Sequence, residues 1–296
     1  MDLNNLEKTI ENIKIAFNRT YAEDILKEKI SKIKDVYISS WEKENLEFLK
    51  EVYNKTSIDN GFPVPVLTVC GKGTKEIRFT KYLGYYLDPN NYHGLQYKFL
   101  KAILNQKCKE ADFRDDWHEN CKVESEYYLG KSTINAKKFS GTVDIAIWDY
   151  DFFIAIENKI LSGESDHPDL NLNQLERYNE LISNNSDLKD KKTIKIYLKP
   201  GLNNEKNKSG WSPLSYEYII NRGIKILDES KLSLTARENL ARLLIDLAIG
   251  PFNKVSDSLL EINRLAKELL EEGFMLQKSI KFDRLTSEHE RILKIL

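Results

Sequence analysis

Residues 141–159, GTVDIAIWDYDFFIAIENK, constrain the fold of this chain more than any other segment. Val, Ile, Phe and Trp, which favour β-strands, stand on both sides of a polar Asp-Tyr-Asp break. Two such runs separated by a short turn predict a β-hairpin. If Tyr150 and Asp151 form the loop, Asp149 pairs with Phe152, and the register of the whole hairpin follows from that pair. The chain should therefore contain a sheet with at least one apolar face.

The predicted register places two acids directly opposite each other. Asp144 and Glu157 become cross-strand partners, and Lys159 shares their face because side chains alternate along a strand. The opposite face collects apolar side chains and should pack on the core: Val143, Ile145, Ile147, Ile154, Ile156 and Ile160. The apolar pattern and the register therefore agree.

Opposed carboxylates repel each other, because their Cβ atoms lie only about 4.5–5.5 Å apart. A shared proton with a raised pKa would relieve this repulsion. A divalent cation would also relieve it, since such cations prefer oxygen ligands. With Lys159 beside the pair, the cation hypothesis leads to phosphodiester hydrolysis, in which a metal activates water and an ammonium stabilises developing charge. The alternative is a strand whose Glu157 and Lys159 simply face water, and Asp144 in register argues against it.

The composition excludes few classes of protein. The chain has 296 residues and a net charge of −1, so its overall charge neither favours nor excludes a polyanionic partner. No apolar run reaches the roughly 18 residues of a membrane helix. The start, MDLNNLEKTIENIK, lacks the basic and apolar parts of a signal peptide. We expect a cytoplasmic protein without a membrane partner.

The cysteines predict neither disulfides nor a zinc site. Cys70, Cys108 and Cys121 are an odd and sparse set, which argues against a disulfide framework. Cys108, His118 and Cys121 lie close in sequence, but a fourth zinc ligand at suitable spacing is missing.

The periodicity of apolar residues divides the chain into three regions. Residues 1–60 repeat apolar side chains at three- to four-residue steps, which predicts a helical N-terminal extension. Residues 61–228 mix helices and strands and should form the core. Residues 229–296 predict a helical C-terminal segment packed on that core. If the protein forms a homo-oligomer, we expect the terminal helices to mediate it.

The order of elements within the core predicts an α/β fold. Helices are expected from about residue 75 and from about residue 97. Strands are expected at about 121–129, 141–149, 152–159 and 193–198. A helix at about 172–183 separates the last two strands, which makes a βαβ crossover if those strands are parallel. A central mixed sheet flanked by helices is the natural architecture.

Four further residues are candidates for the site. Gln174 and Tyr178 lie four positions apart on the helix that follows Lys159, so they share a face; they orient a site group or serve in ordinary packing. Glu76 opens a helix, where the helix dipole alone accounts for an acid. His93 in the NNYHG turn is either a phosphate donor or a turn residue.

Asp144, Glu157 and Lys159, placed between two apolar strands, resemble the motif of the PD-(D/E)xK nuclease superfamily. Thr142-Val143 stands before Asp144 where the name of the superfamily has a proline, a position that varies among such enzymes. Because ExK alone is a weak signal, the other ordered elements matter.

Two more elements carry the resemblance. Gln174 and Tyr178 resemble the QxxxY signature of the RecB-type exonuclease-like branch. The run Glu76–Leu104, EIRFTKYLGYYLDPNNYHGLQYKFLKAIL, resembles a bacterial group with an acid-bearing helix, an LLDP-like turn, an H-G step and an F-L helix. The resemblance spans about residues 75–178.

This resemblance implies a three-layer α/β/α, restriction-endonuclease-like core and a Mg²⁺- or Mn²⁺-dependent phosphodiesterase site. We expect a nuclease for which DNA is favoured over RNA as the substrate. Asp144, Glu157 and Glu76, with the backbone carbonyl of Asn158, would bind the metal. Lys159 would position or activate the attacking water.

The resemblance also implies that Gln174 and Tyr178 shape the site, with His93 a weaker candidate. Such bacterial proteins are commonly linked to defence against foreign DNA, which is an associational hint. The alternatives are a catalytically inactive nucleic-acid-binding or protein-interaction module on the same fold, and a scaffold built on the terminal helices. The intact Asp–Glu–Lys set argues against both.

Overall fold

The structure is a computed structural model that describes residues 23–57, 63–71, 75–134, 137–160, 172–200, 209–229, 231–252 and 265. The chain divides into two compact units, one of residues 52–255 and one of residues 1–51 with 256–296. The described part of the second unit includes α2 (Glu23–Val36), the π-helical η1 (Tyr37–Leu46) and the start of α3 (Glu47–Thr56). The domain limits at residues 60 and 228 stay a prediction.

A five-stranded mixed sheet forms the centre of the larger unit, in the order β1-β2-β3-β4-β5. The strands are β1 (Lys122–Ile134), β2 (Lys137–Trp148), β3 (Phe152–Asn158), β4 (Lys192–Lys199) and β5 (Ser212–Ser215). The first three strands pair antiparallel, and β3, β4 and β5 pair parallel. Strand β5 is not among the strands predicted from the sequence, because four residues that include a proline carry little strand signal.

The β2–β3 hairpin has the predicted register, with Ile145 paired to Ile156. Asp149 closes the two-residue turn: its Oδ1 accepts hydrogen bonds from the backbone N–H groups of Asp151 at 2.7 Å and Phe152 at 3.0 Å. Such a side-chain-to-backbone turn is what an Asp at this position favours. The polar break in the sequence thus sets the register of the two acids.

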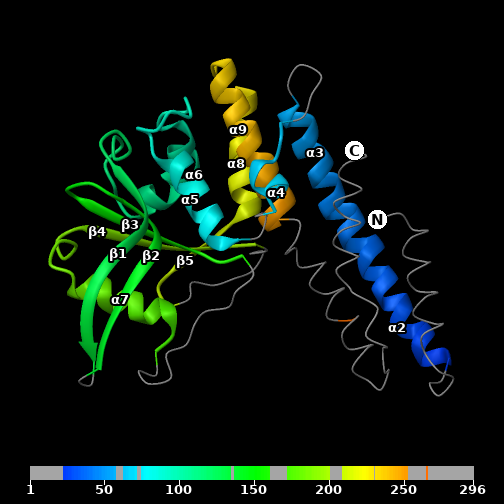
Figure 1. Ribbon diagram of the computed structural model, residues 1–296, viewed down its shortest axis with the longest axis horizontal. Helices are drawn as coiled ribbons and strands as arrows, with labels where there is room; N and C mark the ends of the chain where they lie inside the picture. Colours follow the sequence, from blue (N-terminus) through cyan, green and yellow to red (C-terminus); the bar gives the residue numbers. More distant parts are fainter. Residues whose placement is uncertain are drawn as a thin grey trace. The chain divides into compact units, whose positions relative to one another are not determined.

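Helices cover both faces of the sheet (Figure 1). On one face lies α7 (Gln174–Asn184), and on the other lies α5 (Glu76–Leu87) with α6 (Lys98–Glu110), α8 (Tyr216–Glu229) and α9 (Leu234–Leu247) beyond it. The short α4 (Val66–Val69) contacts α9, which continues into η2 (Ala248–Phe252). The α/β fold with a central mixed sheet is confirmed, and α7 is the predicted connection between parallel strands.

Strand β3 is the most enclosed part of the sheet. All seven of its residues are buried, which accounts for its almost continuous apolar sequence. Under α7, Ala155 and Phe153 belong to a cluster with Leu175, Tyr178 and other buried side chains. Glu157 near the end of this strand is therefore surrounded by packed protein on both sides.

His93 holds the turn that follows α5. Its Nδ1 accepts a hydrogen bond from the backbone N–H of Leu95 at 3.0 Å, and Nε2 lies 2.8 Å from the carbonyl oxygen of Asp88. With Nδ1 accepting, Nε2 carries the proton and donates. Because the ring is buried and both nitrogens bind backbone, the geometry favours the turn interpretation over a phosphate donor.

None of the described helices combines the length and apolar character that a bilayer-spanning segment requires.

The contact between β2 and α7 depends on Gly141. A Cβ atom there would lie 2.7 Å from Leu181 Cδ1 and 2.9 Å from Tyr178 Cε1. We expect Gly141→Ala to lower the free energy of unfolding by about 1–3 kcal/mol, the usual cost of overpacking, as measured by urea denaturation. The neighbouring exposed residue provides the control: Ser140→Ala should stay within about 0.5 kcal/mol of the wild type. Equal stability of the two variants would contradict this account of the packing.

Candidate active site

A capping box fixes where α7 begins. The Asn173 side chain accepts a hydrogen bond from the Glu176 backbone N–H, and the Glu176 carboxylate accepts one from the Asn173 N–H, both at 3.0 Å. Gln174 is therefore the first residue of α7. Its Nε2 donates to Glu157 Oε1 at 2.8 Å, so the start of the helix contacts the acid on β3.

Gln174 and Tyr178 form a connected pair. Gln174 Nε2 also donates to the Tyr178 hydroxyl, which in turn donates to the carbonyl oxygen of Thr142, and both distances are 2.8 Å. A hydroxyl has one proton, so this chain fixes the direction of each bond and the orientation of the amide. The structure thus brings both residues to the acids, and packing alone does not describe them.

Lys159 and the two acids meet where β2 and β3 leave the regular ladder. Lys159 Nζ lies 3.0 Å from Glu157 Oε1, and the Glu157 side chain is only 2% exposed. Asp144 Oδ2 accepts a hydrogen bond from the Asn158 backbone N–H at 2.7 Å. Glu157 accepts one from the Asp144 backbone. The predicted neighbourhood of these three side chains is present.

Burial and mutual repulsion shift the pKa values of both acids upward. Burial raises the pKa of Asp144 to about 6, although the Asn158 N–H and the Lys159 ammonium oppose the shift. Burial and the charge of Asp144 raise the pKa of Glu157 to about 8, again against Lys159. Burial also disfavours the Lys159 ammonium, but the charge of Glu157 outweighs that cost and the pKa of Lys159 is raised. One lysine therefore does not compensate both acids.

Glu76 connects α5 to the chain after β3. It is the first residue of α5, where the helix dipole favours an acid, and its Oε1 accepts a hydrogen bond from the Ile160 backbone N–H at 2.7 Å. Its charge also raises the pKa of Asp144, so it lies near the acid pair. The same carboxylate thus begins a helix and adds negative charge to the site.

Beside the site, an irregularity in β1 changes the face of the sheet to which its side chains point. Ser125 faces α5, because a Cβ built on Gly84 of that helix would meet the Ser125 side chain. Two residues later, the ring of Tyr127 lies 5.6 Å from that of Phe153, in the cluster under α7. Residues two apart in a regular strand share a face. Glu126 between them has a left-handed backbone with φ of 60°, which produces the exchange.

On β2, the side chains change from one face of the sheet to the other at Asp144 in the same way. Val143 belongs to the cluster under α7, whereas Ile145 faces α5. The expectation that these two side chains share a face is therefore wrong, because strict alternation fails between them. Asp144 lies at the point of exchange, where it reaches a hydrogen bond with Thr80 of α5 while it stays beside Glu157. Irregular strands commonly redirect side chains in this way near active sites.

The site fits a hard divalent cation. Glu157 Oε2 and Gln174 Oε1 are buried oxygens without a hydrogen-bond partner, and a cation with its water shell would satisfy such acceptors. Within the described ranges, no three His, Cys, Asp or Glu side chains form a ligand set by themselves. Mg²⁺ is commonly held by one or two carboxylates with waters, so the pair of Asp144 and Glu157 with a backbone carbonyl is a suitable set.

Two residues near the acids, Thr80 and Tyr216, are not among the site residues predicted from the sequence. Thr80 lies four residues after Glu76 on α5, so helical spacing was a signal that could have found it. Tyr216 opens α8 and binds the side chain of Asn158 from far along the chain. No local pattern indicates such a contact.

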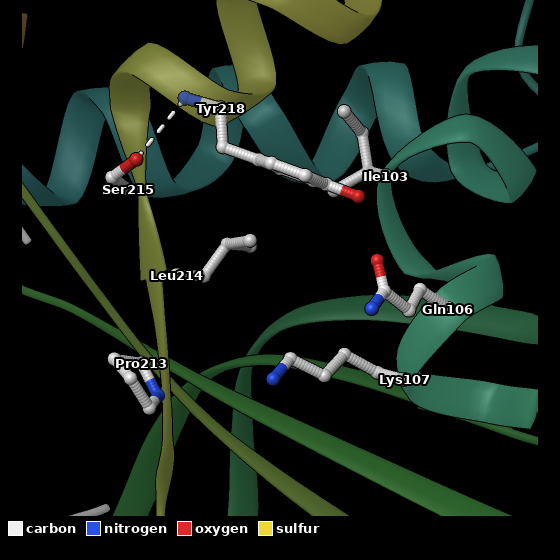
Figure 2. Close-up of a pocket in the computed structure, with 7 residues that line it drawn as sticks. All are labelled: Ile103, Gln106, Lys107, Pro213, Leu214, Ser215 and Tyr218. Carbon is white, nitrogen blue, oxygen red and sulfur yellow. Dashed lines mark hydrogen bonds between the residues drawn. The ribbon is translucent and has the colours of Figure 1, made fainter. Parts of the chain in front are cut away.

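Three cavities of the larger unit lie away from these residues. One, of about 230 Å³, lies between α6, β5 and α8, where Figure 2 shows Lys107, Gln106 and Tyr218 around it. Two others flank the hairpin turn near Tyr150. None of the predicted site residues lines these three cavities.

A comparison with family models finds a match to the PD-(D/E)XK nuclease superfamily over residues 64–246, more than half of the 296 residues. The chain belongs to this superfamily. Within this nuclease superfamily, the assignment to a branch with the QxxxY signature stays a prediction. No curated protein and no solved structure matches the chain.

The raised pKa values predict how stability depends on pH without metal. In the folded protein, Asp144 and Glu157 keep their protons at a higher pH than they do in the unfolded chain. The protonated acids therefore add to the free energy of unfolding below about pH 4, and this contribution is lost as pH rises through about 6 and 8. In the presence of chelator, Glu157→Gln should gain stability relative to the wild type from pH 5 to pH 9, on the order of a few kcal/mol.

Chemical denaturation at several pH values measures this difference. Glu180→Gln, which changes an exposed glutamate on α7, should parallel the wild type throughout. If Glu157→Gln also parallels the wild type, the two acids do not repel each other in the folded protein.

Proposed function

We propose that this member of the superfamily hydrolyses phosphodiester bonds of DNA with the help of Mg²⁺ or Mn²⁺. The main support is the buried pair of Asp144 and Glu157 with Lys159 Nζ 3.0 Å from Glu157 Oε1. Burying two like charges so close together is costly unless a cation neutralises them. An arrangement kept only for packing would not need either acid.

The acids and the lysine of the site have different roles in the proposed reaction. Asp144, Glu157 and the carbonyl of Asn158 would hold the cation, with Glu76 in support. When bound, the cation supplies polarisation of the phosphoryl group and lowers the pKa of water. Lys159, held against Glu157, positions the attacking water and stabilises the charge that develops on the phosphate.

Gln174 and Tyr178 serve the site by positioning. Gln174 keeps Glu157 Oε1 in place, and Tyr178 keeps the Gln174 amide in its orientation through the bond to Thr142. The unpartnered Gln174 Oε1 is available to accept a hydrogen bond from a water at the site.

The choice of DNA over RNA rests on the Asp–Glu–Lys set together with the Gln174–Tyr178 pair. The role in defence against foreign DNA rests on the resemblance of the Glu76–Leu104 run to its bacterial group. A cytoplasmic location stays a prediction. A homo-oligomer through the terminal helices stays a prediction, because most of those residues lie outside the described part of the chain.

Cleavage assays with matched variants test the proposal. Purified protein is incubated with linear, circular and single-stranded DNA and with RNA, in Mg²⁺, Mn²⁺ or chelator. We expect DNA cleavage that needs the metal and falls by about 100-fold or more in Asp144→Asn and in Lys159→Ala, since each removes a charge that the transition state uses. Products are resolved by gel electrophoresis.

Two exposed residues supply controls of the same charge. Asp151→Asn, in the hairpin turn, and Lys189→Ala, after α7, should cleave at the wild-type rate. Cleavage that survives in the Asp144 and Lys159 variants would contradict the assignment. Salt-sensitive DNA binding without cleavage, unaffected by chelator, would instead favour the inactive binding module.

A further inference from the structure

Asn158, between the acid and the lysine of the motif, has a buried and fully engaged side chain. It is 1% exposed. Its Nδ2 donates to Thr80 Oγ1 on α5 at 3.2 Å, and its Oδ1 accepts a hydrogen bond from the hydroxyl of Tyr216 on α8. Thr80 and Tyr216 are 0% exposed. One amide thus joins the end of β3 to two helices.

This network ends at Asp144. Asp144 Oδ2 accepts a hydrogen bond from the Asn158 backbone N–H at 2.7 Å. Thr80 Oγ1 accepts one from the Asn158 amide nitrogen, so the single proton of Thr80 is left for the Asp144 carboxylate beside it, whose pKa Thr80 lowers. The amide oxygen of Asn158 then faces Tyr216, which donates. Every bond in the chain from Tyr216 to Asp144 has one direction.

Simple satisfaction of buried polar groups is the alternative explanation, since buried amides and hydroxyls need partners wherever they lie. Two observations go beyond it. The network ends on a carboxylate of the proposed metal site. Asn158 also binds that carboxylate directly through its backbone N–H, while its side chain binds Thr80, which lies beside the same carboxylate. A network that only filled the core would not need to end there.

We propose that Tyr216, Asn158 and Thr80 are positioning residues that hold the Asp144 carboxylate in the orientation needed to bind a divalent cation. This inference rests on the proposed function. Groups that orient metal ligands typically change metal affinity by 10–100-fold when they are removed. We expect an effect of the same size here, because the hydrogen-bond network holds the Asp144 carboxylate, which is one of the two in the Asp144–Glu157 pair.

Tyr216 lies at the end of this hydrogen-bond network that is farthest from Asp144. Without its hydroxyl, Asn158 Oδ1 has no donor, and a buried acceptor without a partner is unfavourable. The Asn158 amide is then able to turn over so that Oδ1 faces Thr80, where it competes with Asp144 for the Thr80 proton. A bond from Thr80 to Asn158 would release the Asp144 carboxylate from one of its two donors.

Calorimetric titration of the full chain with Mn²⁺, without nucleic acid, tests this inference. Tyr216→Phe should bind Mn²⁺ about tenfold more weakly than the wild type. Tyr86→Phe is the matched control, because Tyr86 is also buried and its hydroxyl donates to a carbonyl, that of Asn239, at 3.0 Å. It should lose similar stability and bind Mn²⁺ like the wild type.

A second position keeps the test independent of the folding of one variant. Thr80→Val removes the hydroxyl at similar volume and should weaken Mn²⁺ binding about tenfold, whereas Thr80→Ser keeps the hydroxyl and should bind within about twofold of the wild type. Tyr216→Phe combined with Thr80→Val should weaken binding by less than the product of the single effects, because both act through one chain.

The outcomes separate this inference from the proposed function. Wild-type affinity in Tyr216→Phe and Thr80→Val, with binding abolished in Asp144→Asn, would overturn the positioning chain and leave the metal site intact. Equal weakening by Tyr86→Phe would also overturn it. If the wild-type protein binds no Mn²⁺, the proposed metal site and the proposed positioning network are both overturned.

Discussion

The burial of Asp144 and Glu157 beside each other is the constraint on which the rest of the site depends. Two acids in packed surroundings keep protons that exposed acids would lose, and both carry raised pKa values here. Lys159 offsets part of the repulsion. The remaining imbalance, with the unpartnered oxygen of Glu157, supports the proposal that a divalent cation is the fourth member of the cluster.

The fold places these charges by a few local devices. The Asp149 turn sets the register of the hairpin, and the capping box of α7 sets the position of Gln174 against Glu157. The left-handed residue Glu126 marks the exchange of faces that lets Asp144 reach α5. Rigid strands and capped helices hold a site more accurately than loops do. Ordinary secondary structure therefore keeps the buried charges in place.

Much of this could be predicted from the sequence because it depends on neighbours along the chain. The hairpin register and the Gln174–Tyr178 pair follow from alternation and helical spacing, and both are present. The exchange of faces at Asp144 could not be predicted, because it depends on a backbone angle that no pattern in the sequence specifies. Tyr216 was missed for another reason: its contact with Asn158 joins residues 58 positions apart.

The most direct measurement is a crystal structure of the protein soaked in Mn²⁺, with anomalous diffraction data. The account predicts an anomalous peak between Asp144 and Glu157, within bonding distance of a carboxylate oxygen from each. Crystals that show no peak there, or acids whose oxygens point to opposite sides of the sheet, would contradict it.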